Sequence, residues 1–309
     1  MNAVNAVTVA PIDPLGPAVA SGRYEDELVV VQRWSGAWPR RGRGNVRTEH
    51  FDVAHVAGRL VVTHCIPRER VDDDLAGVIV DELFGPGWLR GSEMFERIFT
   101  GIVRSMAVGA VDSWELFYRN TIARLAQLEG GPAEPSADLS GHGSIEGYAP
   151  VYDRACELVL PGPVLELGCC FGFLALRLAE RGHDVTASDV SAGTVRLLHT
   201  IASRLGTPLT TLLADAARVP LDDGCADTVL VIHLLEHLDD EHGAEVIDEA
   251  LRCARHRVVV AVPLEEEADE SYGHVRTVTL HDLRDWGVAS GAPYSVTEHH
   301  GGWLVLDKI

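Results

Sequence analysis

The sequence predicts an α/β protein in which a parallel-sheet domain follows a smaller α+β domain. Three observations support this. Strand-like and helix-like segments alternate from about residue 150 onward, a glycine-bearing turn follows the first of those strands, and a stretch rich in Gly, Pro and Ser precedes them. We therefore expect a flexible arm over 1–20, an N-terminal α+β domain over 21–140 and a second domain over 141–309.

The composition narrows the range of partners. The 309 residues are 46% hydrophobic and carry a net charge of -20, so a core can form but a nucleic-acid backbone would be repelled. The six cysteines show no paired metal-ligand spacing, and neither an export signal nor an apolar run long enough for a membrane span occurs. We expect a cytoplasmic protein without nucleic-acid or membrane partners, and its oligomeric state stays open. Lys308 is its only lysine, an Arg-rich pattern typical of an actinobacterial genome.

Strands and then helices are expected in the N-terminal part. The run 27–34 is β-branched and apolar, and 50–66 alternates apolar and polar residues on both sides of a turn at 57–59, as in a β-hairpin. Helical periodicity begins at 71–84 and returns over 92–128. Its apolar members are expected core residues: Phe95, Ile98, Phe99, Ile102, Val103 and Met106.

The C-terminal part alternates between the two kinds of element. Helices are expected at 149–160, 173–181, 192–205 and 280–287, and strands at 164–167, 185–188, 209–213, 227–233 and 257–262. Such alternation predicts a parallel sheet covered by helices on both faces. Two final strand-like runs around Gly301 and Gly302 predict an antiparallel hairpin at the sheet edge.

The most informative segment is 163–191. Gly168 and Gly172 allow the backbone to pass close to a ligand, in a turn that opens a helix. Asp189 closes the next strand, where a carboxylate can accept hydrogen bonds from both hydroxyls of a ribose. The turn has Glu166 at the strand end and lacks the G-x-G-x-x-G of dinucleotide-binding folds. A nucleoside cofactor of another kind, S-adenosylmethionine (SAM), is favoured.

Residues 166–172 resemble motif I of the class I SAM-dependent methyltransferases, commonly E/D-x-G-x-G-x-G, with Cys170 in place of the middle glycine. The resemblance continues through 212–238 and covers about half of the chain. It implies a seven-stranded, Rossmann-like class I methyltransferase domain that binds SAM, with Asp189 on the ribose and Asp215 on the adenine amino group. The cofactor-binding residues implied are Glu166, Gly168, Cys170, Gly172, Asp189, Asp215, Ala216 and His233.

The chain as a whole, through segments such as 13–34, also resembles the mycofactocin oligosaccharide methyltransferases. That resemblance implies O-methylation of a sugar hydroxyl on the glycan of a peptide-derived redox cofactor. Two other functions stay open: O-methylation of a quinone-like or polyketide-like small molecule, and SAM binding without turnover.

Transfer of a methyl group to a hydroxyl requires a group that removes its proton. His237 and Glu236 follow the fourth strand of the domain, and His274 lies in the loop after the fifth, so these are the candidate catalytic residues. His233, Glu236 and His237 would share one face of a helix, where they could bind a divalent cation such as Mg²⁺. Alternatively, Glu236 is hydrogen-bonded to backbone and the histidines are ordinary core or surface residues. The acidic runs 239–241 and 265–267 are expected to face solvent.

Overall fold

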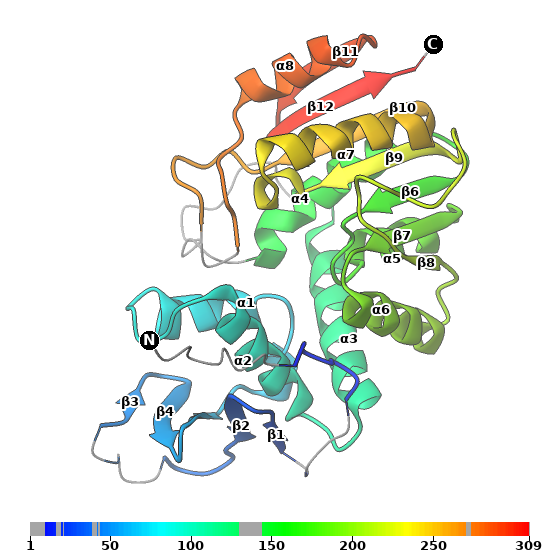
Figure 1. Ribbon diagram of the computed structural model, residues 1–309. Helices are drawn as coiled ribbons and strands as arrows, with labels where there is room; N and C mark the ends of the chain where they lie inside the picture. The colour runs from blue at the N-terminus through cyan, green and yellow to red at the C-terminus, as the bar shows by residue number, and fades with distance from the viewer. Residues whose placement is uncertain are drawn as a thin grey trace, which may run out of the picture. The chain divides into compact units, whose positions relative to one another are not determined.

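The chain was analysed as a computed structural model. It divides into two compact units, Met1–Phe117 and Tyr118–Ile309 (Figure 1). The residues that the structure describes are 10–16, 20, 22–38, 42, 44–129, 144–269 and 273–308. The arm expected over 1–20 and the boundary expected between 140 and 141 fall mainly outside these residues, so both stay predictions.

The N-terminal unit contains a five-stranded sheet in the order β1-β2-β5-β4-β3. The expected hairpin is confirmed, because β4 and β5 pair antiparallel across a turn in which Ala57 and Gly58 have φ of 51° and 81°. The expected strand over 27–34 forms β2, which pairs parallel with β5. The strands are β1 (Arg23–Glu25), β2 (Val29–Arg33), β3 (Val46–Arg47), β4 (Phe51–Val56) and β5 (Arg59–His64).

The helices that follow this sheet are α1 (Leu75–Ile79), the π-helical turn η2 (Val80–Phe84), α2 (Ser92–Arg104) and α3 (Ala110–Leu128), after a 3-10 turn η1 (Arg68–Arg70). Helix α2 packs on β2, where Gly101 leaves room for the Val31 side chain. Of the six expected core residues, five are buried and Phe95 is half-buried. The helical period in the sequence therefore identified this core.

The C-terminal unit contains a seven-stranded sheet in the order β11-β12-β10-β9-β6-β7-β8. Strands β6 to β10 pair in parallel, and β12 runs antiparallel to both β10 and β11. The parallel sheet and its antiparallel terminal hairpin are thus confirmed. The strands are β6 (Val164–Leu167), β7 (Val185–Asp189), β8 (Thr210–Leu213), β9 (Ala226–Ile232), β10 (Ala254–Val262), β11 (Tyr294–Glu298) and β12 (Gly302–Asp307).

Helices pack against this sheet all along its width (Figure 1). Helix α6 contacts β7 and β8, α7 contacts β9 and β10, and α8 contacts β11 and β12. The later parts of the central strands β9 and β10, residues 229–232 and 258–262, are wholly apolar and buried, as expected where a sheet is covered on both faces. The helices are α4 (Ser144–Leu158), α5 (Phe173–Glu180), α6 (Ala192–Leu205), α7 (Asp240–Cys253) and α8 (Leu280–Ala289), with a 3-10 turn η3 (Leu235–His237) before α7.

Helix α7 is the one long element of this unit that the sequence analysis did not place. Its N-cap is Asp239, whose side chain accepts a hydrogen bond from the backbone N–H of His242. Val246, Ile247 and Ala250 form its buried face. The acidic run expected to be only a solvated face therefore includes the cap of a helix.

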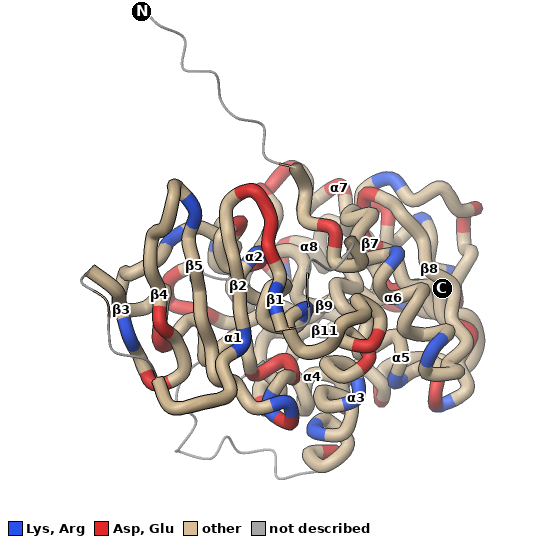
Figure 2. Tube along the Cα trace, turned by 90° about the horizontal axis from the view of Figure 1, so that it is seen from below, with Lys and Arg blue, Asp and Glu red and all other residues tan. Residues whose placement is uncertain are grey.

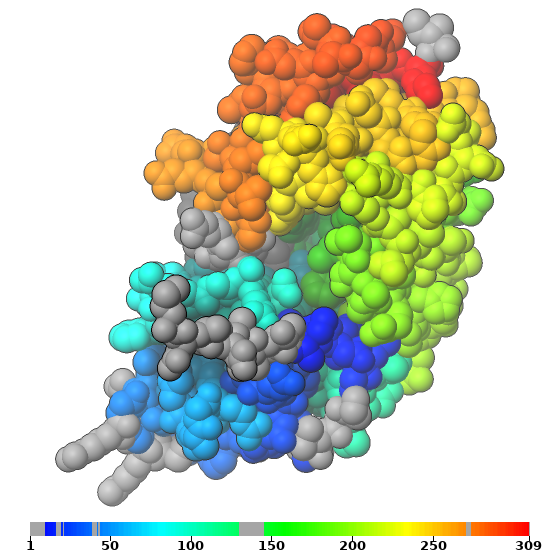
Figure 3. Space-filling model, in the orientation of Figure 1, coloured from blue at the N-terminus to red at the C-terminus, as the bar shows by residue number. Residues whose placement is uncertain are grey.

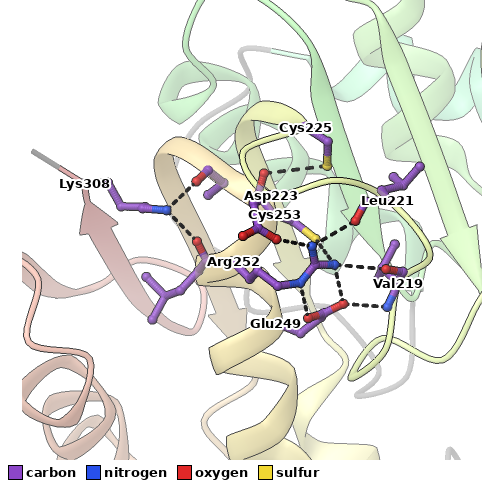
Figure 4. A network of polar contacts seen from close by, with 10 residues as sticks. Val219, Leu221, Asp223, Cys225, Glu249, Arg252, Cys253 and Lys308 are labelled. Carbon is purple, nitrogen blue, oxygen red and sulfur yellow. Dashed lines mark hydrogen bonds and ion pairs between the residues drawn. The ribbon is translucent and has the colours of Figure 1, made fainter.

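Arg252, near the end of α7, holds the segment that precedes β9 (Figure 4). Its guanidinium donates to the carbonyl oxygens of Val219 at 2.9 Å and Leu221 at 2.8 Å. It also pairs with Glu249 and Asp223, both at 2.7 Å. One side chain thus satisfies two backbone carbonyls and orders the chain that leads from β8 to β9.

Charged residues of both signs are scattered over the described trace (Figure 2). Lys and Arg do not gather there into one continuous stripe of the kind that phosphate backbones require. Within the described residues, no helix combines the length and the apolar character needed to cross a bilayer.

We predict that Arg252→Ala lowers the free energy of unfolding by about 2–3 kcal/mol, because two carbonyls and two carboxylates lose a charged partner. Urea denaturation followed by circular dichroism measures the change. Arg218→Ala is the control, since that side chain is 80% exposed and should contribute less than about 0.5 kcal/mol. Equal effects of the two substitutions would contradict the assignment.

Candidate active site

The candidate site lies where the parallel strands of the C-terminal sheet end (Figure 1). Gly168 follows β6, Asp189 ends β7, and His233 follows β9. The order of strands reverses between β6 and β9, since β6 continues to β7 on one side and β9 to β10 on the other. In open α/β sheets this switch point, at the carboxyl ends of the strands, is the usual place for a ligand.

The turn after β6 has a backbone that only small or strained residues adopt. Gly168 and Gly172 have φ of 71° and 73°. A Cβ on Gly168 would lie 2.8 Å from the Leu234 side chain, and one on Gly172 would lie 2.5 Å from Leu198. Cys170 keeps the same left-handed conformation with φ 47°, and its side chain is exposed.

Two further groups hold this turn. The Tyr118 hydroxyl donates to the carbonyl oxygen of Phe171 at 2.7 Å, and the backbone N–H of Cys169 donates to Ser188 of β7 at 2.9 Å. Tyr118 lies in α3, far away in sequence, and no local pattern marks it as part of the site.

Glu166 lies beneath the turn and is only 5% exposed. Burial raises the pKa of its carboxyl to about 8, the charge of Asp189 adds to the shift, and the backbone N–H of Ala175 opposes it. A carboxyl in this environment is mostly protonated near neutral pH.

Asp189 organises the same turn from the neighbouring strand. Its two carboxylate oxygens accept the backbone N–H groups of Cys170 at 3.0 Å and Ser191 at 2.8 Å. Burial raises the pKa of this carboxyl, and those N–H groups oppose the shift. The remaining lone pairs are available to ligand hydroxyls.

Asp215 lies after β8 and is largely exposed. It accepts the backbone N–H of Ala217 at 3.0 Å, and Nε2 of His242 lies 2.9 Å away. These partners lower the pKa of Asp215. Ala216, the residue directly after Asp215, is half-buried. The sequence analysis missed His242, because its contact with Asp215 depends on how α7 packs.

On the other side of the switch point, Glu236, His237 and His274 form a cluster. One ligand atom from each lies within 4.8 Å of the others. The rings of His237 and His274 meet edge to face with centroids 4.9 Å apart. The backbone brings them together, because Val275 donates its N–H to the carbonyl oxygen of Glu236 at 2.9 Å.

Both histidines of the cluster are oriented through Nδ1. Nδ1 of His237 lies 3.2 Å from the carbonyl oxygen of Gly273, and Nδ1 of His274 lies 2.8 Å from a carboxylate oxygen of Glu265. Glu265 is therefore an exception to the expectation that 265–267 only faces solvent. The segment that carries Glu265 and His274 lies beside the start of α7 on the surface of this unit (Figure 3).

His233 lies close to this cluster but outside its closest group. The expected helix face over 233, 236 and 237 does not form, because only η3 (Leu235–His237) is helical and His233 precedes it with φ 52°. Nδ1 of His233 is 3.5 Å from Glu236, and its ring lies 5.1 Å from Tyr148 between centroids. Burial lowers the pKa of His233 to about 4, so its ring is neutral.

Comparison with known families agrees with this topology. Residues 164–257 match the family model described as a methyltransferase domain. The C-terminal unit has the seven-stranded fold of a methyltransferase domain. The match spans β6 to the first half of β10, so it contains the motif I turn, Asp189, Asp215 and the Glu236-His237 pair.

Curated relatives resemble part of the chain. Uncharacterized methyltransferases of Mycobacterium tuberculosis and Mycobacterium bovis are each 36% identical to it over 121 residues, which is 38% of this chain and 46% of theirs. The chain thus spans about half the length of the curated relatives that it matches.

Solved structures also resemble it. Magnesium protoporphyrin IX methyltransferase from Synechocystis, with bound SAH, is 19% identical with a TM-score of 0.47, covering 60% of this chain and 93% of that one. A SAM-dependent methyltransferase from Methanosarcina mazei is 16% identical with a TM-score of 0.43, covering 50% and 97%.

We predict that Asp189→Ala weakens SAM binding at least about 10-fold, because the acceptor expected for the ribose hydroxyls is lost and two loop N–H groups lose theirs. Isothermal titration calorimetry measures the dissociation constant. Asp184→Ala, an exposed aspartate before β7, is the control and should bind SAM like the unchanged protein. Undiminished binding by Asp189→Ala would exclude the ribose assignment.

We further predict that Glu166 makes the domain less stable as the pH rises. Its folded pKa of about 8 is above the unfolded value of about 4.3, so the stabilisation is complete below the unfolded value and is lost as the pH rises through about 8. Glu166→Gln removes this dependence. Between pH 5 and 9 the melting temperature of the unchanged protein should fall by at least about 3 °C more than that of Glu166→Gln. Parallel curves for the two proteins would refute the raised pKa.

Proposed function

We propose that the chain is a SAM-dependent O-methyltransferase that methylates a sugar hydroxyl of a glycosylated small molecule. The observation that carries the proposal is the cluster of Glu236, His237 and His274 at the carboxyl edge of the sheet, in which Glu236 is buried, His274 is half-buried and His237 is exposed. Glu236 and His237 closely follow β9, which pairs with β6, the strand before the motif I turn. Leu234 of the same segment lies against Gly168 of that turn. Groups that can activate a hydroxyl are thus held next to the proposed cofactor site.

The proposed cofactor site uses one part of the sheet edge. Gly168, Cys170 and Gly172 of the turn would hold the methionine part of SAM, with Glu166 of β6 beneath them. Asp189 would accept the ribose hydroxyls, as its position at the end of β7 favours. Asp215 and Ala216 would contact adenine, with His242 beside Asp215. His233 is proposed to border the cofactor, since it follows β9 at the same edge.

The reaction is an in-line displacement. The acceptor oxygen attacks the methyl carbon, the carbon–sulfur bond breaks, and S-adenosylhomocysteine leaves with the sulfur electron pair. The hydroxyl proton must leave as the oxygen attacks, because an alcohol is a weak nucleophile while it is protonated. Glu236, His237 and His274 are the proposed catalytic residues for this step, and holding both reactants close supplies much of the rate.

A sugar acceptor is favoured by the likeness of the whole chain to mycofactocin oligosaccharide methyltransferases. The mycobacterial relatives suit an actinobacterial source, and their names state methyl transfer without a substrate. A polar cluster of one carboxyl and two imidazoles also suits a hydroxylated acceptor. A quinone-like or polyketide-like acceptor is the second candidate for the same chemistry.

The third candidate is a protein that binds SAM without turnover. It would need the turn and Asp189 but would have no use for a hydroxyl-activating cluster. The presence of Glu236, His237 and His274 in one group therefore favours an enzyme.

The test is incubation of the purified full chain with trideuteromethyl-labelled SAM and a metabolite extract of an actinobacterium. Mass spectrometry should find a hexose conjugate that gains one labelled methyl group. Labelling of an aromatic metabolite would instead support the second candidate. SAM binding without any labelled product would support the third.

We predict that His237→Ala lowers kcat at least about 100-fold with the labelled acceptor and leaves the dissociation constant of SAM within about threefold, because it removes a group that acts only on the acceptor. His281→Ala is the control, since that histidine on α8 is exposed. A variant that keeps its kcat would remove His237 from the catalytic group.

A further inference from the structure

We propose that Glu236, His237 and His274 bind one divalent transition-metal ion, to which the acceptor hydroxyl is a further ligand. The catalytic part of this proposal rests on the proposed function, whereas the metal site itself does not. It replaces His233 by His274 in the ligand set expected from the sequence. The three residues come from η3 and from the loop after β10, so the fold assembles a site that no sequence spacing shows.

The cluster offers two imidazole nitrogens and one carboxylate oxygen as ligand atoms. The three ligand atoms lie within 4.8 Å of one another, close enough that small side-chain rotations bring them to bonding distance of one ion. Such a set leaves coordination positions for water or a substrate oxygen. A metal with open positions is what activation of a hydroxyl requires.

The surroundings of both histidines are those of metal ligands. A ligating histidine almost always donates its second N–H to a carboxylate or a backbone carbonyl, which fixes its tautomer and ring orientation. Nδ1 of His274 is 2.8 Å from Glu265, and Nδ1 of His237 is 3.2 Å from the carbonyl oxygen of Gly273. In both rings Nε2 is then the nitrogen that carries the lone pair.

Glu236 gives an independent indication of a ligand. Its side chain is only 1% exposed, and among the described residues neither of its carboxylate oxygens has a hydrogen-bond partner. An unpaired buried carboxyl costs several kcal/mol as an ion, and such groups are rare unless something else satisfies them. A bound cation would supply both the charge and the bonds.

Burial raises the pKa of Glu236 and the charge of Arg276 opposes this shift, but the Arg276 guanidinium bonds to other groups. Arg276 donates to the carbonyl oxygen of Leu235 at 3.1 Å, pairs with Asp240 and lies over the Trp286 ring. Among the described residues, Arg276 thus makes no hydrogen bond to the carboxylate of Glu236.

The ligand types select the metal. Imidazole suits Zn²⁺, Fe²⁺ or Ni²⁺, whereas Mg²⁺ prefers oxygen ligands and keeps much of its water. Two histidines and one glutamate thus favour Zn²⁺ over the Mg²⁺ suggested by the sequence. On binding, the ion would lower the pKa of the acceptor hydroxyl, whose proton passes to solvent before the oxygen attacks the methyl group.

The experiment uses tag-free full-length protein equilibrated with Zn²⁺, desalted and measured by inductively coupled plasma mass spectrometry. Co²⁺ is the second probe, because its visible d–d absorption reports coordination without any assay of activity. The variants are Glu236→Gln and His274→Ala for the ligands, Glu265→Gln for the residue that orients His274, and His281→Ala as the control. SAM affinity and melting temperature are measured on each to verify folding.

One equivalent of Zn²⁺ is expected in the unchanged protein and in His281→Ala. Glu236→Gln and His274→Ala should lose it, and Glu265→Gln should bind about 10–100-fold more weakly. No stoichiometric binding, or equal binding by all the variants, overturns the proposal. Full methyl transfer by chelated, metal-free protein also overturns it and leaves His237 as a direct base. Bound metal without any methylated acceptor would instead refute the proposed function and leave the metal site standing.

Discussion

The candidate site depends on the register of the parallel strands in the C-terminal sheet. Leu167, the last residue of β6, pairs with Ser188 of β7 on one side and with Val231 of β9 on the other. Asp189 and His233 are each one or two residues beyond these partners, so the three strands end at the same level. A shift of β7 by one residue would turn the Asp189 side chain to the opposite face of the sheet. The backbone ladder therefore fixes which polar side chains can meet a single ligand.

Burial explains why two glutamates at this edge differ from ordinary surface carboxyls. Glu166 and Glu236 are both almost fully enclosed, and burial raises the pKa of each to about 8. Glu166 lies in β6, all four residues of which are buried, and Glu236 lies in η3 beside the buried Leu235. Ionised carboxylates would be expensive there without partners. The folded chain thus accepts an energetic cost at the two positions that flank the proposed site.

The parts of the site that lie in one continuous segment could be predicted from the sequence. The turn with Gly168 and Gly172, Asp189 at the next strand end and Glu236 with His237 each follow an apolar run within a few residues. The structure places all of them at one edge of the sheet. His274 could be proposed only from its place in the loop after the fifth strand. Its contact with His237 arises from one backbone hydrogen bond between distant segments, Val275 to Glu236.

The site residues and the helix that could not be predicted from the sequence depend on tertiary packing. Tyr118, His242 and Glu265 carry no local signal, because a tyrosine in a long helix and an acid in an acidic run are usually structural or solvated. Helix α7 was not placed because charged residues crowd its first turn and obscure the period of Val246, Ile247 and Ala250. Both kinds of omission arise when the deciding partner lies on another element.

Cys170 shows how the fold tolerates a departure from motif I. The position needs a left-handed backbone, since this conformation presents its N–H to Asp189 at 3.0 Å. A cysteine there costs about 1–2 kcal/mol more than a glycine, because its Cβ approaches its own carbonyl. Its thiol is exposed, so no neighbouring side chain has to move to make room for it. Gly168 and Gly172 differ, because a Cβ at either would meet Leu234 or Leu198. The turn therefore requires its outer glycines for space and its middle residue only for backbone conformation.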